Sequence, residues 1–485
     1  MFGNFQPTSS EYLRFLPEIL LSFFGIVIMM LEAVAKGKRT YLGVIALVAI
    51  AAAFIANVWA YFNAGPAFQN MIVVDGYGSF FRGLVLLVGF LCILTAFSYL
   101  EREGAQTGEY YALILFSLVG QCILSTATDL IMVFIGLEIS SIATYILAGF
   151  LRDDRRNNES ALKYFLLGSF ATAFLLYGIA WIYGLTSSTN LEDIRRALTQ
   201  GQQPIVLVGL AAALLFVGFA FKVSVAPFQI WTPDVYQGAA APVTAFMSAG
   251  PKAAAFAIFF RVFLTSFRPF SERWLPLVWG CALATMIIGN FAALLQTNVK
   301  RLLGYSSIAH AGYVMIALTA ASQVGTAAAM FYLVSYALMN IGAFAVISHV
   351  ASRNERHVKI EDLAGLGKRE PVIAALFAIF VFSLIGVPLT GGFFGKFYVF
   401  QAALNSHLVW LTVLGLVNSA IAAYYYLKII VAIYMHEPRA TTEQLPPPAP
   451  SLRLAIWASA IGTLILGIFP SALLSFASFS AAAFR

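Results

Sequence analysis

About fourteen apolar runs, each close to twenty residues long and separated by short polar segments, constrain this chain more than any other feature. About 20 apolar residues are enough to cross the hydrocarbon core of a bilayer as a helix. Because 60% of the 485 residues are hydrophobic and 11% are charged, a soluble fold could not bury this apolar surface. We therefore predict an all-α polytopic membrane protein with about 14 transmembrane helices. The predicted spans are residues 11–35, 41–62, 78–100, 110–127, 130–151, 161–184, 204–226, 242–265, 275–295, 302–321, 325–350, 371–404, 408–435 and 452–474.

The loop charges predict how these helices are oriented. Cytoplasmic loops of membrane proteins carry an excess of lysine and arginine. The loops after odd-numbered runs hold Lys36, Lys38, Arg39, Arg102, Arg152, Arg155, Arg156, Lys300, Arg301, Arg353, Arg356, Lys359, Lys368, Arg369 and Arg439. The opposite side holds Arg14, Arg195, Arg196, Arg268, Arg273 and Arg485. We therefore place the first set in the cytoplasm and both termini outside, and we expect neither a removable signal peptide nor binding to nucleic acid.

Two segments echo each other and suggest an internal repeat. "GLEISSIATYIL" (136–147) and "GYSSIAHAGYVMI" (304–316) share SSIA, and a proline interrupts an apolar run at a similar distance after each, at Pro227 and Pro388. Broken helices in corresponding halves are typical of transporters built from inverted repeats. We predict two inverted five-helix repeats with broken helices 7 and 12. The predicted units are a three-helix N-terminal segment (1–105), the repeats (106–270 and 271–436), and a proline-rich loop with a C-terminal helix (437–485).

Residues 185–203 predict a short amphipathic helix at the membrane interface, capped by Thr189 or Asn190. We find no nucleotide-binding glycine motif and no CxxC pair or His/Cys cluster. The sequence therefore predicts no cofactor-binding and no metal-binding residues in this chain.

Four charged residues lie well inside predicted spans: Glu138, Lys222, Lys252 and Lys396. Ionisable groups at this depth are costly, and they usually mark an ion or proton path. Desolvation favours the neutral amine of a lysine, whereas a nearby carboxylate favours the ammonium, so moving Glu138 relative to Lys222 would switch whether Lys222 holds its proton. The alternative is a set of buried ion pairs that only fix helix packing.

Other residues are weaker candidates for the same path. His310 lies within the tenth span and could relay protons, although a core histidine bonded to a carbonyl is an equal alternative. Lys163 could meet Glu138, but an interfacial anchor is the stronger interpretation. We interpret Lys300, Arg301 and Lys428 as loop or snorkelling charges, and Asp234 as a residue that pins the segment after the seventh span.

Three segments carry a resemblance to a known family: "FKVSVAPFQIWTPDVYQGAAAPVTAFMSAGPKAAAF", "LLGYSSIAHAGY" and "GVPLTGGFFGKFYVF". They closely resemble the subunit N family of the proton-translocating NADH:quinone oxidoreductase, respiratory complex I. The resemblance implies an antiporter-like fold in which Glu138 and Lys222 form the input pair, Lys252 the central relay and Lys396 the exit-side residue. It also implies a bacterial inner membrane, other membrane-arm subunits as partners, and NADH, FMN, iron–sulfur clusters and quinone bound by partner subunits.

Two alternatives remain open at this stage. A subunit of a multi-component cation/proton antiporter would share the fold without redox coupling, but its sodium sites would need grouped oxygen ligands, whereas this core is rich in lysine. A purely structural membrane subunit would use the same charges only for packing.

Overall fold

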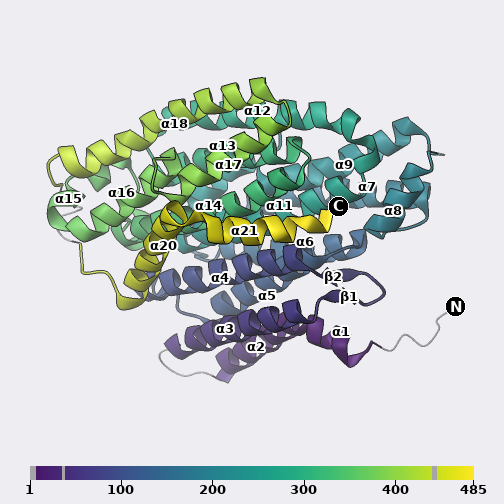
Figure 1. The fold of residues 1–485 in the computed structure, drawn as a ribbon. Coiled ribbons are helices and arrows are strands. Elements are labelled where there is room, and N and C mark those ends of the chain that lie inside the picture. The colour runs from purple at the N-terminus through teal and green to yellow at the C-terminus, as the bar shows by residue number, and fades with distance from the viewer. Residues whose placement is uncertain (1–6, 35–38, 202, 440–444, 485) are drawn as a thin grey trace.

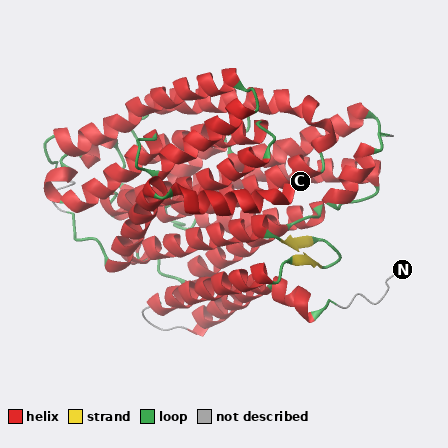
Figure 2. Ribbon diagram, viewed as in Figure 1, coloured by secondary structure: helices red, strands yellow, loops and turns green. Residues whose placement is uncertain are grey.

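The computed structural model describes residues 7–34, 39–201, 203–439 and 445–484 of the chain. Within these ranges the chain is helical, apart from loops and one two-stranded hairpin (Figure 2). Three of the loop charges used above, Lys36, Lys38 and Arg485, lie outside the described residues, as does part of the proline-rich loop (440–444).

The N-terminal segment contains three long helices; the first two lie along one side of the molecule, and the third lies between them and the central helices (Figure 1). The antiparallel hairpin between the second and third of them was not predicted, because its strands are only three residues long. The elements are α1 (Ser9–Arg14), α2 (Leu16–Val34), α3 (Thr40–Phe62), β1 (Gly65–Ala67), β2 (Ile72–Val74) and α4 (Gly76–Glu103).

The next helices form two groups, and the predicted boundary between the repeats, after residue 270, falls at the end of the short helix η1 (Arg268–Phe270). The first contains α5 (Gly108–Thr126), α6 (Leu130–Ala148), α7 (Arg155–Thr186), α8 (Leu191–Thr199), α9 (Ile205–Val223), α10 (Trp231–Gly238) and α11 (Ala241–Thr265). The second contains η1 (Arg268–Phe270), α12 (Ser271–Leu294), α13 (Val299–Thr319), α14 (Gln323–Val350), η2 (Arg353–Glu355), η3 (Ile360–Leu363), α15 (Leu366–Arg369), α16 (Pro371–Ile385), α17 (Gly391–Asn405) and α18 (Val409–Met435). The short helix α8 is the predicted amphipathic one, and Asn190 caps it by accepting from the amides of Glu192 and Asp193.

The C-terminal part differs from the prediction of one helix. The chain forms α20 (Pro450–Ile468), α21 (Pro470–Ser480) and η4 (Ala481–Phe484). Pro470 has no amide hydrogen to continue the helix, and a new helix starts at this residue. The second helix, α21, then packs on α4 and α14.

Thirteen helices of the described chain are long and apolar enough to cross a membrane, which confirms a multi-pass membrane protein. The remaining predicted span, residues 371–404, is divided between α16 and α17. Each has 15 residues. At 1.5 Å per residue each half reaches about 22 Å, short of the roughly 30 Å hydrocarbon core. The two halves together make the broken twelfth span.

Both predicted helix breaks are present and have the same local form. Helix α9 ends before Ser224, whose φ is 65°, and α16 ends before Gly386, whose φ is 95°. A left-handed residue stops a helix because the next amide can no longer reach the carbonyl four residues earlier. In each case a non-helical stretch follows, and the chain resumes as α10 or α17.

Glycines bring each SSIA helix close to the helix that precedes it. A Cβ atom on Gly120 of α5 would lie 2.4 Å from the carbonyl oxygen of Gly136, and one on Gly289 of α12 would lie 2.6 Å from the amide nitrogen of Ala309. Small residues permit such close backbone contact between membrane helices. The two copies of the motif therefore make corresponding packing contacts, as a repeat requires.

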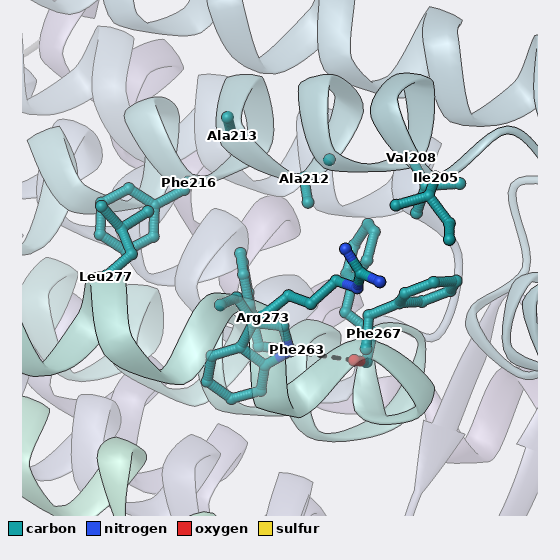
Figure 3. A pocket seen from close by; sticks show the side chains of 12 residues that line it. Ile205, Val208, Ala212, Ala213, Phe216, Phe263, Phe267, Arg273 and Leu277 are labelled. Carbon is teal, nitrogen blue, oxygen red and sulfur yellow. Dashed lines mark hydrogen bonds between the residues drawn. The ribbon is translucent and has the colours of Figure 1, made fainter.

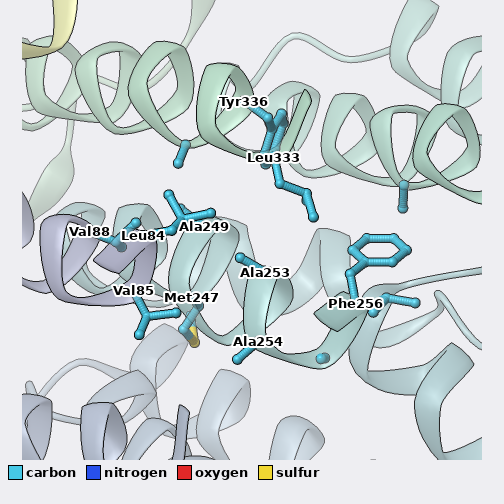
Figure 4. Packing of buried hydrophobic residues seen from close by; sticks show 14 of the residues in the cluster. Leu84, Val85, Val88, Met247, Ala249, Ala253, Ala254, Phe256, Leu333 and Tyr336 are labelled. Carbon is cyan, nitrogen blue, oxygen red and sulfur yellow. The ribbon is translucent and has the colours of Figure 1, made fainter. Parts of the chain in front are cut away.

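Helices α11 and α14 form the centre of the bundle and are buried almost along their whole length. Alanines of α11, including Ala249 and Ala253, lie between larger side chains of α4 and α14, such as Val88 and Leu333 (Figure 4). The small faces of α11 let both neighbours approach closely. Lys252 is carried at this packed centre.

A fully buried ion pair joins the N-terminal segment to the bundle. The Arg82 guanidinium of α4 lies 2.6 Å from the Glu18 carboxylate of α2, and both side chains are completely buried. Arg82 also donates to the carbonyl of Arg14 at 3.1 Å and to the Thr126 hydroxyl at 3.4 Å. Four helices, α1, α2, α4 and α5, therefore meet at one guanidinium.

Removing one partner of this pair should destabilise the protein strongly, because the other charge stays buried. We expect Glu18→Ala to lower the free energy of unfolding by about 3–5 kcal/mol. The double variant Glu18→Leu/Arg82→Met removes both charges, so its free energy of unfolding should fall by less than that of Glu18→Ala. Denaturant unfolding of the purified protein measures both. Glu437→Ala is the control, because its pair with Lys368 is exposed and worth about 0–1 kcal/mol. A similar loss for Glu18→Ala and the control would contradict the prediction.

Candidate functional site: buried lysines at the helix breaks

Lys222 lies in the last turn of α9, directly before the first helix break. Its side chain is buried, and Nζ donates to the Ser141 hydroxyl at 2.7 Å and to the Tyr164 hydroxyl at 3.2 Å. The ammonium also lies 5.4 Å from the Tyr145 ring centre and 5.1 Å from that of Tyr164. Hydroxyl oxygens and aromatic faces therefore stabilise this charge.

Glu138 lies on α6, one turn before Ser141, and is half-buried. In the described part of the chain no salt bridge joins Glu138 to Lys222; the lysine contacts Ser141 and Tyr164 instead. The structure therefore places the two residues of the expected input pair on packed elements without direct ion-pair contact.

Lys252 lies near the middle of α11, where it is buried. Its Nζ donates to the Ser307 hydroxyl at 2.5 Å and to the Ser307 carbonyl at 3.1 Å. The Ser307 hydroxyl lies 3.4 Å from the Tyr236 hydroxyl of α10. The lysine at the centre of the bundle is thus held by the second SSIA motif and lies close to the second half of the broken helix.

His310 follows one turn later on α13 and is also buried. Its Nδ1 lies 2.6 Å from the Tyr332 hydroxyl, and its Nε2 lies 3.2 Å from the Tyr426 hydroxyl. The Tyr426 hydroxyl also bonds to Ser306. The Tyr426 hydroxyl therefore lies between His310 and Ser306, and the partners of His310 are two phenols rather than the carbonyl of the alternative interpretation.

Lys396 lies on α17 and reaches back across the second helix break. Its Nζ donates to the carbonyls of Leu384 and Ile385, at 3.0 and 2.8 Å, and to the Ser419 hydroxyl at 2.9 Å. These carbonyls belong to the last turn of α16, where a helix has unpaired acceptors and partial negative charge. The end of one half-helix therefore binds the cation carried by the other.

Side chains connect the histidine region to Lys396 in a nearly continuous line. Tyr425, which precedes Tyr426, donates to Asn290 at 3.0 Å, and the Asn290 amide lies 3.4 Å from the Tyr313 hydroxyl. The Lys396 ammonium lies 5.1 Å from the Tyr313 ring centre. Between Lys252 and Lys396 the structure therefore places hydroxyl and imidazole groups, which can both donate and accept a proton, and the Asn290 amide, which hydrogen-bonds to two of the phenols.

The connection from Lys222 to Lys252 is less complete. Tyr164 stacks on Trp231 at 4.4 Å, and the Trp231 indole donates to the Phe221 carbonyl at 2.9 Å. Tyr236 then contacts Trp231 edge to face. Contacts between aromatic rings bridge this interval among the described side chains.

Lys163 and Lys300 differ from Lys222, Lys252 and Lys396 because each has a carboxylate partner. Lys163 bonds to Glu159 at 2.7 Å and to Asp234 at 2.8 Å, so its partner is Asp234 rather than Glu138. Arg301 contacts the same Asp234 carboxylate at 2.6 Å. Asp234 thus pins α10 to its neighbours, as predicted.

Lys300 corrects the sequence-based interpretation. It is fully buried rather than a loop or snorkelling charge, it pairs with Glu355, and it donates to the Ala239 carbonyl at 2.5 Å. Glu355 in turn accepts from the amide of Ala241, the first residue of α11, at 2.6 Å. A single acidic residue among the arginines of segment 352–357 was the signal in the sequence that could have located this partner.

Comparisons with known proteins identify the family of this chain. The family model for the transmembrane region of NADH:quinone oxidoreductase and Mrp antiporters matches residues 127–422. This chain belongs to that family. It is 60% identical over 473 residues to NADH-quinone oxidoreductase subunit N 1 of Solibacter usitatus, covering 97% of each chain. The resemblance to subunit N predicted from the sequence is therefore confirmed.

Solved structures from the family have the same fold. A chain of respiratory complex I from Thermus thermophilus is 34% identical, with a TM-score of 0.81, over 95% of this chain and 98% of that one. A chain of the Mrp complex from Dietzia sp. DQ12-45-1b has a TM-score of 0.85 at 21% identity, covering 97% of both, which shows a shared fold.

Glu355 should hold the start of α11 in place. In Glu355→Ala, the Lys300 ammonium and the Ala241 amide both lose an acceptor, so we expect faster hydrogen exchange at the α11 N-terminus. Hydrogen–deuterium exchange of peptides covering residues 239–242 measures this. Glu355→Gln retains an acceptor oxygen and should show a smaller increase. Glu361→Ala, which removes an exposed pair with Arg439, is the control. Unchanged exchange in Glu355→Ala would contradict the assignment.

Proposed function

We propose that this chain is a membrane-arm subunit of an NADH:quinone oxidoreductase and translocates protons through Lys222, Lys252, His310 and Lys396. Redox chemistry in partner subunits drives the transfer, and those subunits bind NADH, FMN, iron–sulfur clusters and quinone. The observation that carries the proposal is the bonding of the three lysines. Each is buried, and each is bound by hydroxyl or carbonyl oxygens rather than by a carboxylate in the described part of the chain.

This bonding suits proton transfer better than an ion pair does. A carboxylate partner stabilises only the ammonium form and would trap the proton. A hydroxyl can accept from an ammonium and donate to a neutral amine, so it supports both states. The hydroxyl-bound lysines are therefore the relay sites, whereas Lys163 and Lys300 are structural.

The charge of Glu138 controls whether Lys222 holds its proton. Glu138 shares a helix face with Ser141, one turn away, and Ser141 bonds to Lys222. A change in charge at or near Glu138 alters the field at Lys222 without requiring direct contact. The half-buried position of Glu138 leaves it within reach of a neighbouring membrane subunit.

The membrane is the bacterial inner membrane, with both termini on the periplasmic side. The loop charges support this orientation through the positive-inside rule. The antiporter alternative without redox coupling is less favoured, because the 60% identical relative is named as an NADH-quinone oxidoreductase subunit.

Replacing Lys252 tests whether proton exchange or charge alone matters. We expect Lys252→Ala and Lys252→Arg both to abolish most NADH-driven proton uptake by inverted membrane vesicles, because an arginine side chain keeps its proton in proteins. Complex assembly is checked on native gels, and Lys368→Arg at an exposed site is the control. Normal proton uptake by the assembled Lys252→Arg complex would reject the relay and favour a structural charge.

The hydroxyl of Tyr426 connects Ser306 with His310, so its removal should slow transfer without disturbing the fold. We expect Tyr426→Phe to reduce NADH-driven proton uptake about tenfold, which corresponds to roughly 1.4 kcal/mol, within the range of one lost hydrogen bond. Tyr424→Phe, in the same helix but on the exposed surface, is the matched control. Equal uptake rates in the two variants would exclude Tyr426 from the path.

A further inference from the structure

An apolar cleft opens on the surface of the bundle where the two repeats meet. One wall is α9, with Val208, Gly209 and Ala212, and the other is formed by the end of α11, η1 and the start of α12, including Phe263 and Trp274 (Figure 3). The cleft has a cavity volume of about 140 Å³. Small residues of α9 leave it open, because a Cβ atom on Gly209 would meet nothing within 4 Å.

One cation projects into this apolar cleft. The Arg273 side chain extends from α12 so that its guanidinium lies between the two walls (Figure 3). Neither a hydrogen bond nor a salt bridge to Arg273 is present among the described residues; the indole of the neighbouring Trp274 donates to the Phe267 carbonyl instead. Arg273 is exposed at the mouth of the cleft, where a planar guanidinium can bind the oxygen atoms of an anion.

The depth of the cleft matches one leaflet of a bilayer. Its α9 wall runs from Ile205, the first residue of that helix, to Phe216. At 1.5 Å per residue this is about 16 Å, close to half of the roughly 30 Å hydrocarbon core. Arg273 lies near the start of α12, at the end of the cleft where α9 also begins, which is the level expected of lipid headgroups.

We propose that this cleft binds one anionic phospholipid, with its phosphate on Arg273 and an acyl chain along Gly209 and Ala212. The combination of a cation at headgroup depth with an apolar groove one leaflet deep fits a charged lipid. A zwitterionic lipid also carries a phosphate, but its own cation compensates that charge, so the positive charge of Arg273 favours a lipid with a net negative charge. Because α9 and α11 belong to the first repeat and α12 to the second, the lipid connects the two repeats at their outer junction. This inference is independent of the proton path.

Two variants test the headgroup and the acyl chain separately. The assembled complex is placed in nanodiscs of equal parts phosphatidylcholine and phosphatidylglycerol, and the lipids it retains are counted by native mass spectrometry. We expect Arg273→Gln to weaken retention of one phosphatidylglycerol about fivefold. Gly209→Leu should also displace it, because the new side chain occupies the cleft without contacting protein atoms. Gly184→Leu, near the end of α7 and in equally open space, is the matched control.

A photo-reactive phenylalanine at Leu277, which lines the cleft, tests the occupant in native membranes even if a variant fails to assemble. A phosphatidylglycerol or other anionic-lipid adduct supports the proposal. An adduct with a partner subunit would overturn it, because a protein helix would then cover the cleft. The proposal is also overturned if the parent, Arg273→Gln and Gly209→Leu retain phosphatidylglycerol equally. It is overturned as well if Arg273→Gln loses phosphatidylcholine and phosphatidylglycerol to the same extent.

Discussion

A positive charge held deep inside a helix bundle must find oxygen atoms to replace water, and this requirement shapes the centre of the protein. The cost of an unsolvated ammonium reaches several kcal/mol, so it persists only where the fold supplies acceptors. An unbroken transmembrane helix has few free hydrogen-bond acceptors, because its carbonyls are already bonded within the helix. The chain supplies them by ending helices within the span. The last turn of α16 presents two carbonyls to Lys396, and SSIA serines present hydroxyls to Lys222 and Lys252.

The buried and half-buried lysines separate into two chemical classes. Lys163 and Lys300 have carboxylate partners and tie α10 and α11 to neighbouring elements, so their charge is compensated and fixed. The hydroxyl- and carbonyl-bound lysines lack this compensation, and their charge can change at a smaller electrostatic cost. In the proposed mechanism, lysine therefore stabilises the fold in one environment and exchanges protons in the other. Partner chemistry, rather than burial, distinguishes the two roles.

The sequence predicted those features that depend on local composition. Apolar run length located the spans, and the prolines at 227 and 388 located the two helix breaks, because a missing amide and a fixed φ act at the residue itself. Intramembrane position alone identified Lys222, Lys252 and Lys396. Tertiary partners were beyond this reasoning: Lys300 looked like a loop charge because Glu355 lies 55 residues away in sequence. The phenols around His310 come from α14 and α18, and no local pattern marks them. The break at Pro470 did have a sequence signal, a proline within an apolar run, which matched the signals used elsewhere.

The helix breaks also connect the site to conformational change. Lys222 lies two residues before the first break and takes its acceptors from α6 and α7, whereas Lys396 bonds across the second break. A shift of either half-helix against its neighbours would therefore separate an ammonium from its acceptors. Lys252 lies in the packed interior of α11, where alanines fit closely against α4 and α14 and little movement is possible. A displacement at either break would therefore change the proton affinity of an outer lysine while leaving that of the central one nearly constant. A rigid central site between two adjustable ones is an arrangement in which protons can move in a preferred direction, because only the outer affinities need to alternate.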